Sequence, residues 1–190
     1  MTPIPSPRPL RVRSFAPVVN AASRVLILGS MPGAASLRAR EYYAHPRNLF
    51  WPLMETLAGV PRAAPYPERL AQLLARGIGL WDVLESCTRA SSLDSDIVEA
   101  SIVANDFARL FAAFPSIEIV CFNGGKAAAA FRKHVLPSLA GVNGVAFHDL
   151  PSTSPANASI AYEKKLAAWR ARVRAASGER ATAQRRSRRA

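Results

Sequence analysis

The sequence has too few cysteines for the common metal and cluster sites. Cys87 and Cys121 are the only two among 190 residues, and they form no Cys-x-x-Cys pair. A structural zinc site or an iron–sulfur cluster takes about four such ligands, so two isolated cysteines exclude both classes. We therefore expect two reduced, buried thiols and a protein that uses no metal and no other cofactor.

Long apolar stretches are also absent. No run of apolar residues approaches the roughly 18 residues that a membrane-spanning helix needs. The first ten residues contain four prolines and lack the apolar centre of a secretory signal. These absences predict a cytoplasmic protein without a membrane partner, and we expect it to act as a monomer.

The glycine-based nucleotide-binding motifs are missing as well. Gly29-Ser-Met-Pro-Gly33 follows an apolar run, but no Gly-Lys-Ser/Thr comes after it and it does not match Gly-x-Gly-x-x-Gly. This excludes the P-loop and the dinucleotide fingerprint. The two glycines still allow the backbone to approach a ligand, and Pro32 stiffens the turn. Taken alone, the segment fits an ordinary turn after a strand better than a binding site.

Positive charge is what the sequence has in excess. The formal net charge is +12, and residues 170–190 alone hold eight arginines and one glutamate. Residues 1–169 carry 17 basic and 12 acidic side chains, so this part is only mildly basic. Excess cationic charge favours a polyanionic partner such as DNA through counterion release. The basic tail reads no sequence, and a compositional bias toward Ala and Arg explains it equally well.

Short apolar runs alternate with amphipathic segments along the chain. Four runs are typical of buried strands, and they cover residues 24–28, 78–84, 117–122 and 145–150. Five segments are typical of helices, and they cover residues 49–58, 67–75, 106–114, 126–135 and 159–176. Asn48 and Asn105 are expected to cap two of these helices. The alternation predicts an α/β fold: a three-layer sandwich with a mostly parallel four-stranded sheet flanked by helices.

Three regions follow from this pattern. Residues 1–14 form a Pro-rich N-terminal extension, residues 15–176 a single domain, and residues 177–190 a basic tail that we expect to be disordered. Ligands bind beyond the carboxyl ends of parallel strands. The loops that leave those ends are residues 29–48, the residues after Asp82, and residues 151–157. We expect these three loops to converge on one cleft.

The segment Glu41-Tyr-Tyr-Ala-His-Pro-Arg-Asn-Leu-Phe-Trp51 is the most informative part of the sequence. Loops rarely carry such aromatic density unless it packs a site. Aromatic faces can stack on a base, and Arg can bind a phosphate. A small core that pins the loop is the alternative, and for Trp51 alone we expect that role.

The segment Pro151-Ser-Thr-Ser-Pro-Ala-Asn157 places three hydroxyls and an amide just before the last expected helix. Hydroxyls and helix N-terminal amides bind phosphate oxygens well. Capping of the following helix is the alternative interpretation of the same residues.

Taken in order, the three motifs resemble the hypoxanthine-DNA glycosylase group, family 6 of the uracil-DNA glycosylase superfamily. The resemblance extends from Arg24 to about Trp169, and the segment from Tyr42 to Trp51 is its specific part. It implies a monofunctional DNA glycosylase that hydrolyses the N-glycosidic bond of deaminated bases such as uracil, hypoxanthine and xanthine. The product would be an abasic site for base excision repair. DNA is then the partner, with the damaged base flipped out of the duplex, and no lyase step is expected.

The resemblance also assigns roles to single residues. Most members of the superfamily carry a catalytic Asp or Asn in the first motif, where this sequence has Ser30 or Met31. Family 6 carries a functional amide instead in the His-Pro-Arg-Asn segment, and this amide corresponds to Asn48. Phe50 resembles the phenylalanine that stacks on the flipped base. Asp82 lies where relatives read the base edge, and as a carboxylate it could also orient water.

We therefore predict Asn48 and Asp82 as the catalytic residues. The predicted base pocket consists of Gly29, Ser30, Met31, Phe50 and Asp82. Phosphate-binding or loop positions are predicted at Pro32, Gly33, His45, Arg47, Ser152, Thr153, Ser154 and Asn157. Ser152 replaces a histidine that relatives often have, so a cationic donor to the base oxygen is missing and a broad choice of deaminated bases is favoured. Ala156, near the residue that wedges into the helix in uracil-specific enzymes, is too small to fill the gap.

Several alternatives stay open at this point. The chain could be a catalytically inactive DNA-binding module, although the presence of both Asn48 and Phe50 argues against it. It could be an α/β hydrolase of free nucleotides, although a phosphate-cradling loop is absent, or a glycosylase directed mainly at uracil. Asp82 could instead cap a turn. We interpret Asn123 as a turn residue and Lys165, like the other lysines, as a solvated charge.

Overall fold

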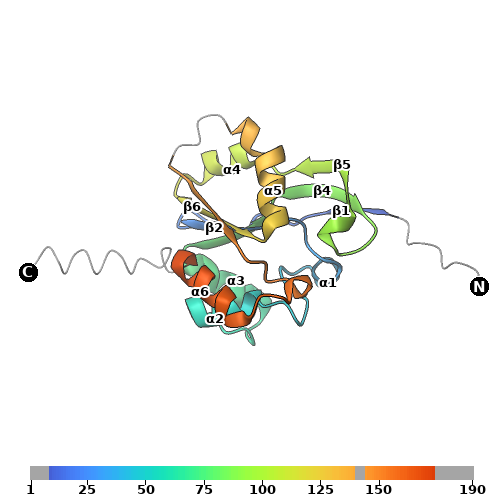
Figure 1. Cartoon of the computed structure of the whole chain (residues 1–190). Helices are drawn as coiled ribbons and strands as arrows, with labels where there is room; N and C mark the ends of the chain where they lie inside the picture. Colours follow the sequence, from blue (N-terminus) through green and yellow to red (C-terminus); the bar gives the residue numbers. More distant parts are fainter. Residues whose placement is uncertain (1–8, 140–143, 174–190) are drawn as a thin grey trace, which may run out of the picture.

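The computed structural model describes residues 9–139 and 144–173, which form a layered α/β fold (Figure 1). A four-stranded sheet with the order β3-β2-β6-β7 lies at its centre. Its strands are β2 (Val25–Gly29), β3 (Ile78–Asp82), β6 (Ile119–Asn123) and β7 (Ala146–Leu150). All three pairings are parallel. The predicted fold class, a four-stranded parallel sheet flanked by helices, is confirmed.

Alternate side chains of β2 enter two separate cores, one on each face of the sheet. Leu26 and Leu28 enter one core, and Val25 and Ile27 enter the other. The first core is covered by α4 (Phe107–Ala113) and α5 (Gly125–His134), and the second by α2 (Phe50–Ala58), α3 (Tyr66–Ala75) and α6 (Tyr162–Val173), as Figure 1 shows. A strand buried on both faces is what a continuous apolar run in a parallel sheet predicts. No helix of the described residues is long and apolar enough to cross a membrane.

The sequence does not predict a second sheet, which is antiparallel and three-stranded. It has the order β1-β4-β5, with β1 (Leu10–Arg13), β4 (Leu84–Arg89) and β5 (Ile97–Ala104). A single residue, Val83, separates β4 from β3, so the two strands merge into one apolar run in the sequence. Strand β5 is exposed at four of its eight positions, so it lacks the continuous burial of the central strands. The extension predicted for residues 1–14 thus ends in a strand of the folded domain, and the tail predicted for residues 177–190 lies outside the described part.

Several element ends differ from the expectation for local reasons. The predicted loop of residues 29–48 contains a short helix, α1 (Ala34–Ala39). Asp106, rather than Asn105, caps α4, because its side chain accepts a hydrogen bond from the Arg109 amide. Asn105 instead donates a hydrogen bond from Nδ2 to the backbone oxygen of Asp82 at 2.8 Å.

Three short 3-10 turns complete the described fold: η1 (Asp94–Asp96), η2 (Leu136–Ser138) and η3 (Pro155–Asn157). Both cysteines are buried and free, as predicted.

Candidate active site

A cavity of about 660 Å³ opens beyond the carboxyl ends of the parallel strands. The loop after β2, Asp82 at the end of β3 and the loop after β7 contribute to its wall, so two of the three predicted loops converge as expected. The loop predicted after Asp82 is wrong, because the chain continues through Val83 directly into β4. Of the predicted site residues, all but Phe50 line it: Gly29, Ser30, Met31, Pro32, Gly33, His45, Arg47, Asn48, Asp82, Ser152, Thr153, Ser154 and Asn157. The volume is typical of small-molecule pockets and suffices for a single base.

Asp82 ends β3 and is 3% exposed. Its Oδ2 accepts a hydrogen bond from Ser14 Oγ at 2.6 Å, and its Oδ1 lies so close to Gly29 that a Cβ there would be 2.5 Å away. Burial raises the pKa of Asp82 to about 7, the Ser14 hydrogen bond opposes this shift, and the charge of Asp94 adds to it. Near neutral pH, both the protonated carboxyl form and the carboxylate form of Asp82 are therefore populated. No backbone amide in the described part of the chain donates to it, so the structure does not support a turn cap.

The aromatic wall of the cavity comes from Tyr43 rather than from Phe50. Phe50 is fully buried, and its ring stacks on Tyr43 with 3.9 Å between the ring centroids. The rings of Trp51 and Trp169 meet Phe50 edge-on. Tyr43 lines the cavity and Phe50 does not. The predicted stacking of Phe50 on the base is therefore wrong, because this ring supports Tyr43 from behind, whereas Trp51 faces the core as expected.

The hydroxyl of Tyr43 is a buried polar group inside the site, close to the Asn123 side chain. It is buried and makes no hydrogen bond of standard geometry with the residues that the structure describes. Burial, together with the nearby Asp82 charge, raises the pKa of Tyr43 well above its usual range, so the phenol keeps its proton. An unsatisfied buried donor is costly. A bound ligand that presents an acceptor would relieve this cost.

The side chain of Asn48 is oriented by the start of α2. Its Oδ1 accepts a hydrogen bond from the Phe50 amide at 2.9 Å, which distinguishes the carbonyl oxygen from the amide nitrogen. Leu49 occupies the N-cap position of α2, so Asn48 does not cap the helix as predicted. Its side chain instead closes a turn onto the Phe50 amide, one residue before the cap position. The Leu49 amide donates to the Thr153 oxygen at 3.0 Å and ties this segment to the last loop. A carbonyl oxygen has two lone pairs, so Oδ1 can still accept from a water molecule.

Asn123, which the sequence indicates as a turn residue, lines the cavity at the end of β6. Its Nδ2 donates to Thr153 Oγ1 at 2.9 Å, and its Oδ1 accepts from the Thr153 amide at 2.8 Å. Thr153 is fully buried, so it holds the loop in place rather than meeting a phosphate. The next residue, Gly124, has a φ of 106°, and a Cβ there would lie 2.8 Å from Ser152 Cβ. Only glycine fits this close approach of β6 to the last loop.

Lys165 is fully buried, so its interpretation as a solvated charge is wrong. Its Nζ donates to the backbone oxygens of Ser152 and Asn157, each at 2.7 Å. Burial lowers the pKa of this ammonium group. From the same helix, Trp169 Nε1 donates to the Pro151 oxygen at 3.0 Å. Helix α6 thus fixes the backbone of residues 151–157 from behind, while side chains of this loop line the cavity.

Replacing Lys165 with methionine should lower the free energy of unfolding by about 2–3 kcal/mol, because two buried carbonyl oxygens lose a charged donor. Urea denaturation measures this difference. Lys164→Met is the matched control, since Lys164 is the exposed neighbour on the same helix and its replacement should change stability by less than about 0.5 kcal/mol. Equal effects of the two substitutions would contradict the assigned role of Lys165.

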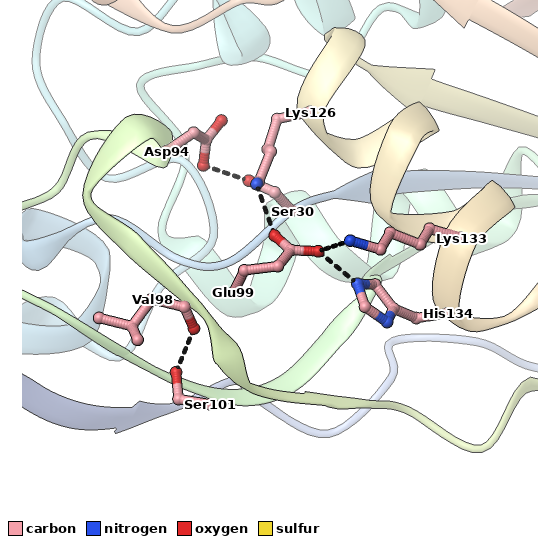
Figure 2. Close-up of polar contacts among 8 residues, drawn as sticks. All are labelled: Ser30, Asp94, Val98, Glu99, Ser101, Lys126, Lys133 and His134. Carbon is pink, nitrogen blue, oxygen red and sulfur yellow. Dashed lines mark hydrogen bonds and ion pairs between the residues drawn. The ribbon is translucent and has the colours of Figure 1, made fainter.

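The loop between β4 and β5 covers one side of the cavity and is the part of the wall that the sequence does not predict. Ser30 Oγ donates to Asp94 Oδ1 of this loop at 2.6 Å, a contact drawn in Figure 2. The buried guanidinium of Arg89 donates to the Pro32 oxygen. The Ser30 hydroxyl is thus engaged within the protein, so this residue shapes the predicted base pocket by joining two loops.

His45, Arg47 and Ser154 lie around the rim. The Arg47 amide donates to His45 Nδ1 at 3.1 Å, so a neutral His45 ring carries its proton on Nε2. The side chain of Arg47 is exposed and free to meet a phosphate. Ser154 Oγ accepts from the Ala156 amide and caps the short turn η3 rather than the last helix, which begins only at Tyr162. Its hydroxyl proton remains available to a further acceptor.

Comparisons with known proteins point to one family. The sequence model of the Uracil DNA glycosylase superfamily matches residues 16–176. A curated hypoxanthine DNA glycosylase of Methanosarcina barkeri (strain Fusaro) is 34% identical over 143 residues, which cover 70% of this chain and 89% of that protein. The chain belongs to the uracil-DNA glycosylase superfamily. A second hypoxanthine DNA glycosylase, from Methanosarcina acetivorans, is 36% identical over 140 residues, which cover 69% of this glycosylase and 87% of the relative.

A solved structure supports the same family. The solution NMR structure of a Methanosarcina acetivorans protein, described as a candidate uracil DNA glycosylase, matches this glycosylase with a TM-score of 0.74 at 34% identity. The match covers 88% of this chain and 99% of that one. The protein is a DNA glycosylase, a DNA-repair hydrolase of N-glycosyl bonds whose substrate partner is DNA.

Proposed function

We propose that this glycosylase acts as a monomer and excises hypoxanthine and uracil, with xanthine as a further substrate, to leave abasic sites for base excision repair. The two relatives named hypoxanthine DNA glycosylase support the choice of hypoxanthine. The observation that carries the proposal is the meeting of Asn48, Asp82 and Tyr43 in one cavity of base size. Asn48 can position water, and Asp82 and Tyr43 can recognise the edge of a base.

Asp82 and Tyr43 together fit the edge that deamination creates. Hypoxanthine and uracil carry a ring N–H next to a carbonyl oxygen, where adenine and cytosine carry a ring nitrogen next to an amino group. The Asp82 carboxylate accepts from the ring N–H, and the Tyr43 hydroxyl, which makes no hydrogen bond of standard geometry with the described residues, donates to a carbonyl oxygen. Adenine or cytosine would set its amino group against the tyrosine donor and its bare nitrogen against the carboxylate, whereas guanine and thymine carry the same N–H and carbonyl pair and must be excluded by the shape of the pocket. A site that leaves such groups unpaired discriminates strongly.

Hydrolysis requires charge stabilisation at the base and a positioned water at the sugar. The C1′–N bond breaks with its electron pair going to the base, the water oxygen bonds to C1′, and a water proton balances the charge on the departing base. The remaining lone pair of Asn48 Oδ1 holds this water. Because an amide is a poor base, Asn48 contributes positioning and electrostatics rather than proton abstraction.

No lyase step is part of the proposal. A lyase of this kind needs a lysine amine that attacks C1′, and among the described residues no lysine lines the cavity. Lys165, which is the lysine bonded to the last loop, has its ammonium group engaged by two carbonyl oxygens. We therefore assign the protein a single hydrolytic step that leaves the DNA backbone intact.

A gel assay tests the proposed function. Oligonucleotides that carry hypoxanthine, uracil, xanthine or only ordinary bases are incubated with the full chain, in single-stranded and duplex form, and abasic sites are cleaved with alkali. Alkali-dependent cleavage at hypoxanthine and uracil is expected, with none at the ordinary bases. Binding without cleavage would support the inactive DNA-binding module instead, and cleavage before alkali would show a lyase step. Hydrolysis of a free deoxyinosine nucleotide but not of DNA would favour the nucleotide hydrolase.

A further inference from the structure

Leu93 is an exposed apolar side chain at the mouth of the cavity. Among the described residues, five large hydrophobic side chains are exposed, and Leu93, at 51%, is the one of these that also lines the cavity. A single exposed leucine on a protein surface needs no explanation by itself. The proposed function brings a duplex to this mouth, however, so an apolar side chain exposed there requires an explanation.

The backbone of Leu93 is fixed on both sides. Its amide donates to Ser91 Oγ at 3.0 Å, and its carbonyl oxygen accepts from the Asp96 amide at 3.1 Å. Ser91 Oγ in turn hydrogen-bonds the Asp96 carboxylate. The turn is therefore closed on itself, and it presents the leucine side chain outward.

Two more hydrogen bonds attach this turn to the segment after β2. Ser92 Oγ accepts from the Ala34 amide at 2.8 Å, and Asp94 Oδ1 accepts from Ser30 Oγ at 2.6 Å. These anchors lie on either side of Leu93 in the sequence. The side chain thus has a defined position relative to the wall of the cavity.

The strand that follows the turn is also tied down, as Figure 2 shows. Glu99 of β5 accepts from Lys133 Nζ at 2.7 Å, and the same oxygen is 2.9 Å from His134 Nε2. Its other oxygen lies 3.5 Å from Lys126 Nζ. Exposed ion pairs contribute little stability singly. Two lysines and a histidine from α5 on one carboxylate nevertheless restrict where the stem of the turn can move.

The loop after β7 offers no comparable side chain. Residues 152–157 present serines, a threonine, a proline, Ala156 and an asparagine to the cavity. Ala156 is exposed, and its methyl group is too small to replace a base in the stack. A flipped nucleotide leaves a gap between its neighbours, and enzymes and architectural proteins fill such gaps with apolar wedges such as leucine.

From this geometry we infer that Leu93 is the wedge that enters the duplex and occupies the space left by the flipped nucleotide. The inference rests on the proposed excision of bases from DNA. It assigns the insertion to the loop between β4 and β5 instead of the loop after β7. A wedge stabilises an open duplex, so its contribution should be confined to double-stranded substrates, because a single strand has no stack to open.

Leu93→Ala tests the inference through the ratio of two rates. Single-turnover excision of hypoxanthine is measured in a duplex and in the same oligonucleotide as a single strand. The duplex rate should fall by about 10- to 100-fold, because the alanine variant no longer replaces the stacking that the duplex loses when the nucleotide flips out. The single-strand rate should fall at least tenfold less. Leu93→Met, which keeps a long apolar side chain, should restore most of the duplex rate.

The matched control is Val103→Ala, which removes an exposed apolar side chain from β5 away from the cavity and should alter neither rate. Thermal melting of each variant verifies that it is folded. An unchanged duplex rate in Leu93→Ala, or equal losses on both substrates, would overturn the wedge. A wild-type chain that excises from neither substrate would instead refute the proposed function, so the two failures are distinguishable.

Discussion

Asn48→Ala is expected to lower the single-turnover rate of excision by about 10²–10³-fold, the size of effect seen when one preorganised transition-state hydrogen bond is removed. The physical reason is the loss of the oxygen that holds the attacking water. That oxygen is already oriented by the Phe50 amide, so the wild-type site needs no rearrangement when C1′ becomes electron-deficient. Quenched-flow or manual gel assays with excess enzyme on a hypoxanthine duplex measure the rate directly.

Asn48→Asp is the informative companion to the alanine variant. Aspartate keeps an oxygen for the Phe50 amide and another for water, and it loses only the Nδ2 donor. We expect it to retain at least about a tenth of the wild-type rate, because the lost hydrogen bond is not the one to the water. Both variants should remain folded at 25 °C, since removal of one side-chain hydrogen bond near a helix start costs about 1 kcal/mol. An alanine variant with wild-type activity would remove Asn48 from the mechanism.

Asp82→Asn is expected to eliminate the pH dependence of excision and to lower the rate at pH 8 by about 10²-fold. The pKa of Asp82 is raised to about 7 by burial, so the carboxylate that accepts from the ring N–H forms only as the pH rises through this value. The wild-type rate should therefore increase about tenfold per pH unit below 7 and level off above it. An asparagine cannot titrate, and its profile should be flat. A wild-type profile without an inflection near neutral pH would contradict this role.

The same carboxyl group should make the stability of the protein depend on pH. Its pKa is about 7 in the folded protein against an ordinary value of 3.8, so the folded state binds the additional proton between these values. The free energy of unfolding therefore falls as the pH rises from 4 to 7 and changes no further above 7. A shift of this size corresponds to about 4 kcal/mol. Between pH 5 and a pKa of about 7 the contribution falls over roughly two pH units, so urea denaturation at pH 5 and pH 8 should show a loss of about 3 kcal/mol in the wild type and not in Asp82→Asn.

The Asp82→Asn substitution separates a catalytic role of Asp82 from a structural one. If the buried carboxylate is kept for catalysis, the asparagine variant is more stable than the wild type at pH 8 while being less active. The side chains around it are Ser14, Tyr42, Arg89 and Asp94, and none of them is changed. A variant that is both less stable and less active at pH 8 would indicate that Asp82 mainly holds the fold.

The parallel sheet and the converging loops could be predicted because their signals are local. Continuous apolar runs ended by glycine or a polar residue mark strands that are buried on both faces, and the strand ends fix where the loops meet. The second sheet has no such signal. Strand β1 lies in a Pro-rich segment, and its partner β4 is separated from β3 by a single residue. The pairing of β1 with β4 joins residues more than 70 positions apart, which no local pattern encodes.

Within the site, the residue types were predictable but their orientations were not. Tyr43 and Phe50 belong to the same aromatic motif, and only the packing shows that one faces the cavity and the other supports it. A loop has no periodic pattern from which the direction of a side chain can be predicted. The roles of Asn123 and Lys165 likewise depend on hydrogen bonds to the loop of residues 151–157. Neither bond can be predicted from the sequence around Asn123 or Lys165. A lysine in an amphipathic helix gives no indication that backbone carbonyl oxygens of another loop accept its hydrogen bonds.

Direct detection of the released base tests the central claim, that this cavity hydrolyses the glycosidic bond of a deaminated base. A duplex with one hypoxanthine is incubated with excess full-length protein, and free hypoxanthine is quantified by liquid chromatography and mass spectrometry. The wild type should release about one equivalent of hypoxanthine, and the Asn48→Ala, Asp82→Asn double variant should release almost none in the same time. No free base from the wild type, or equal release by the folded double variant, would contradict the account.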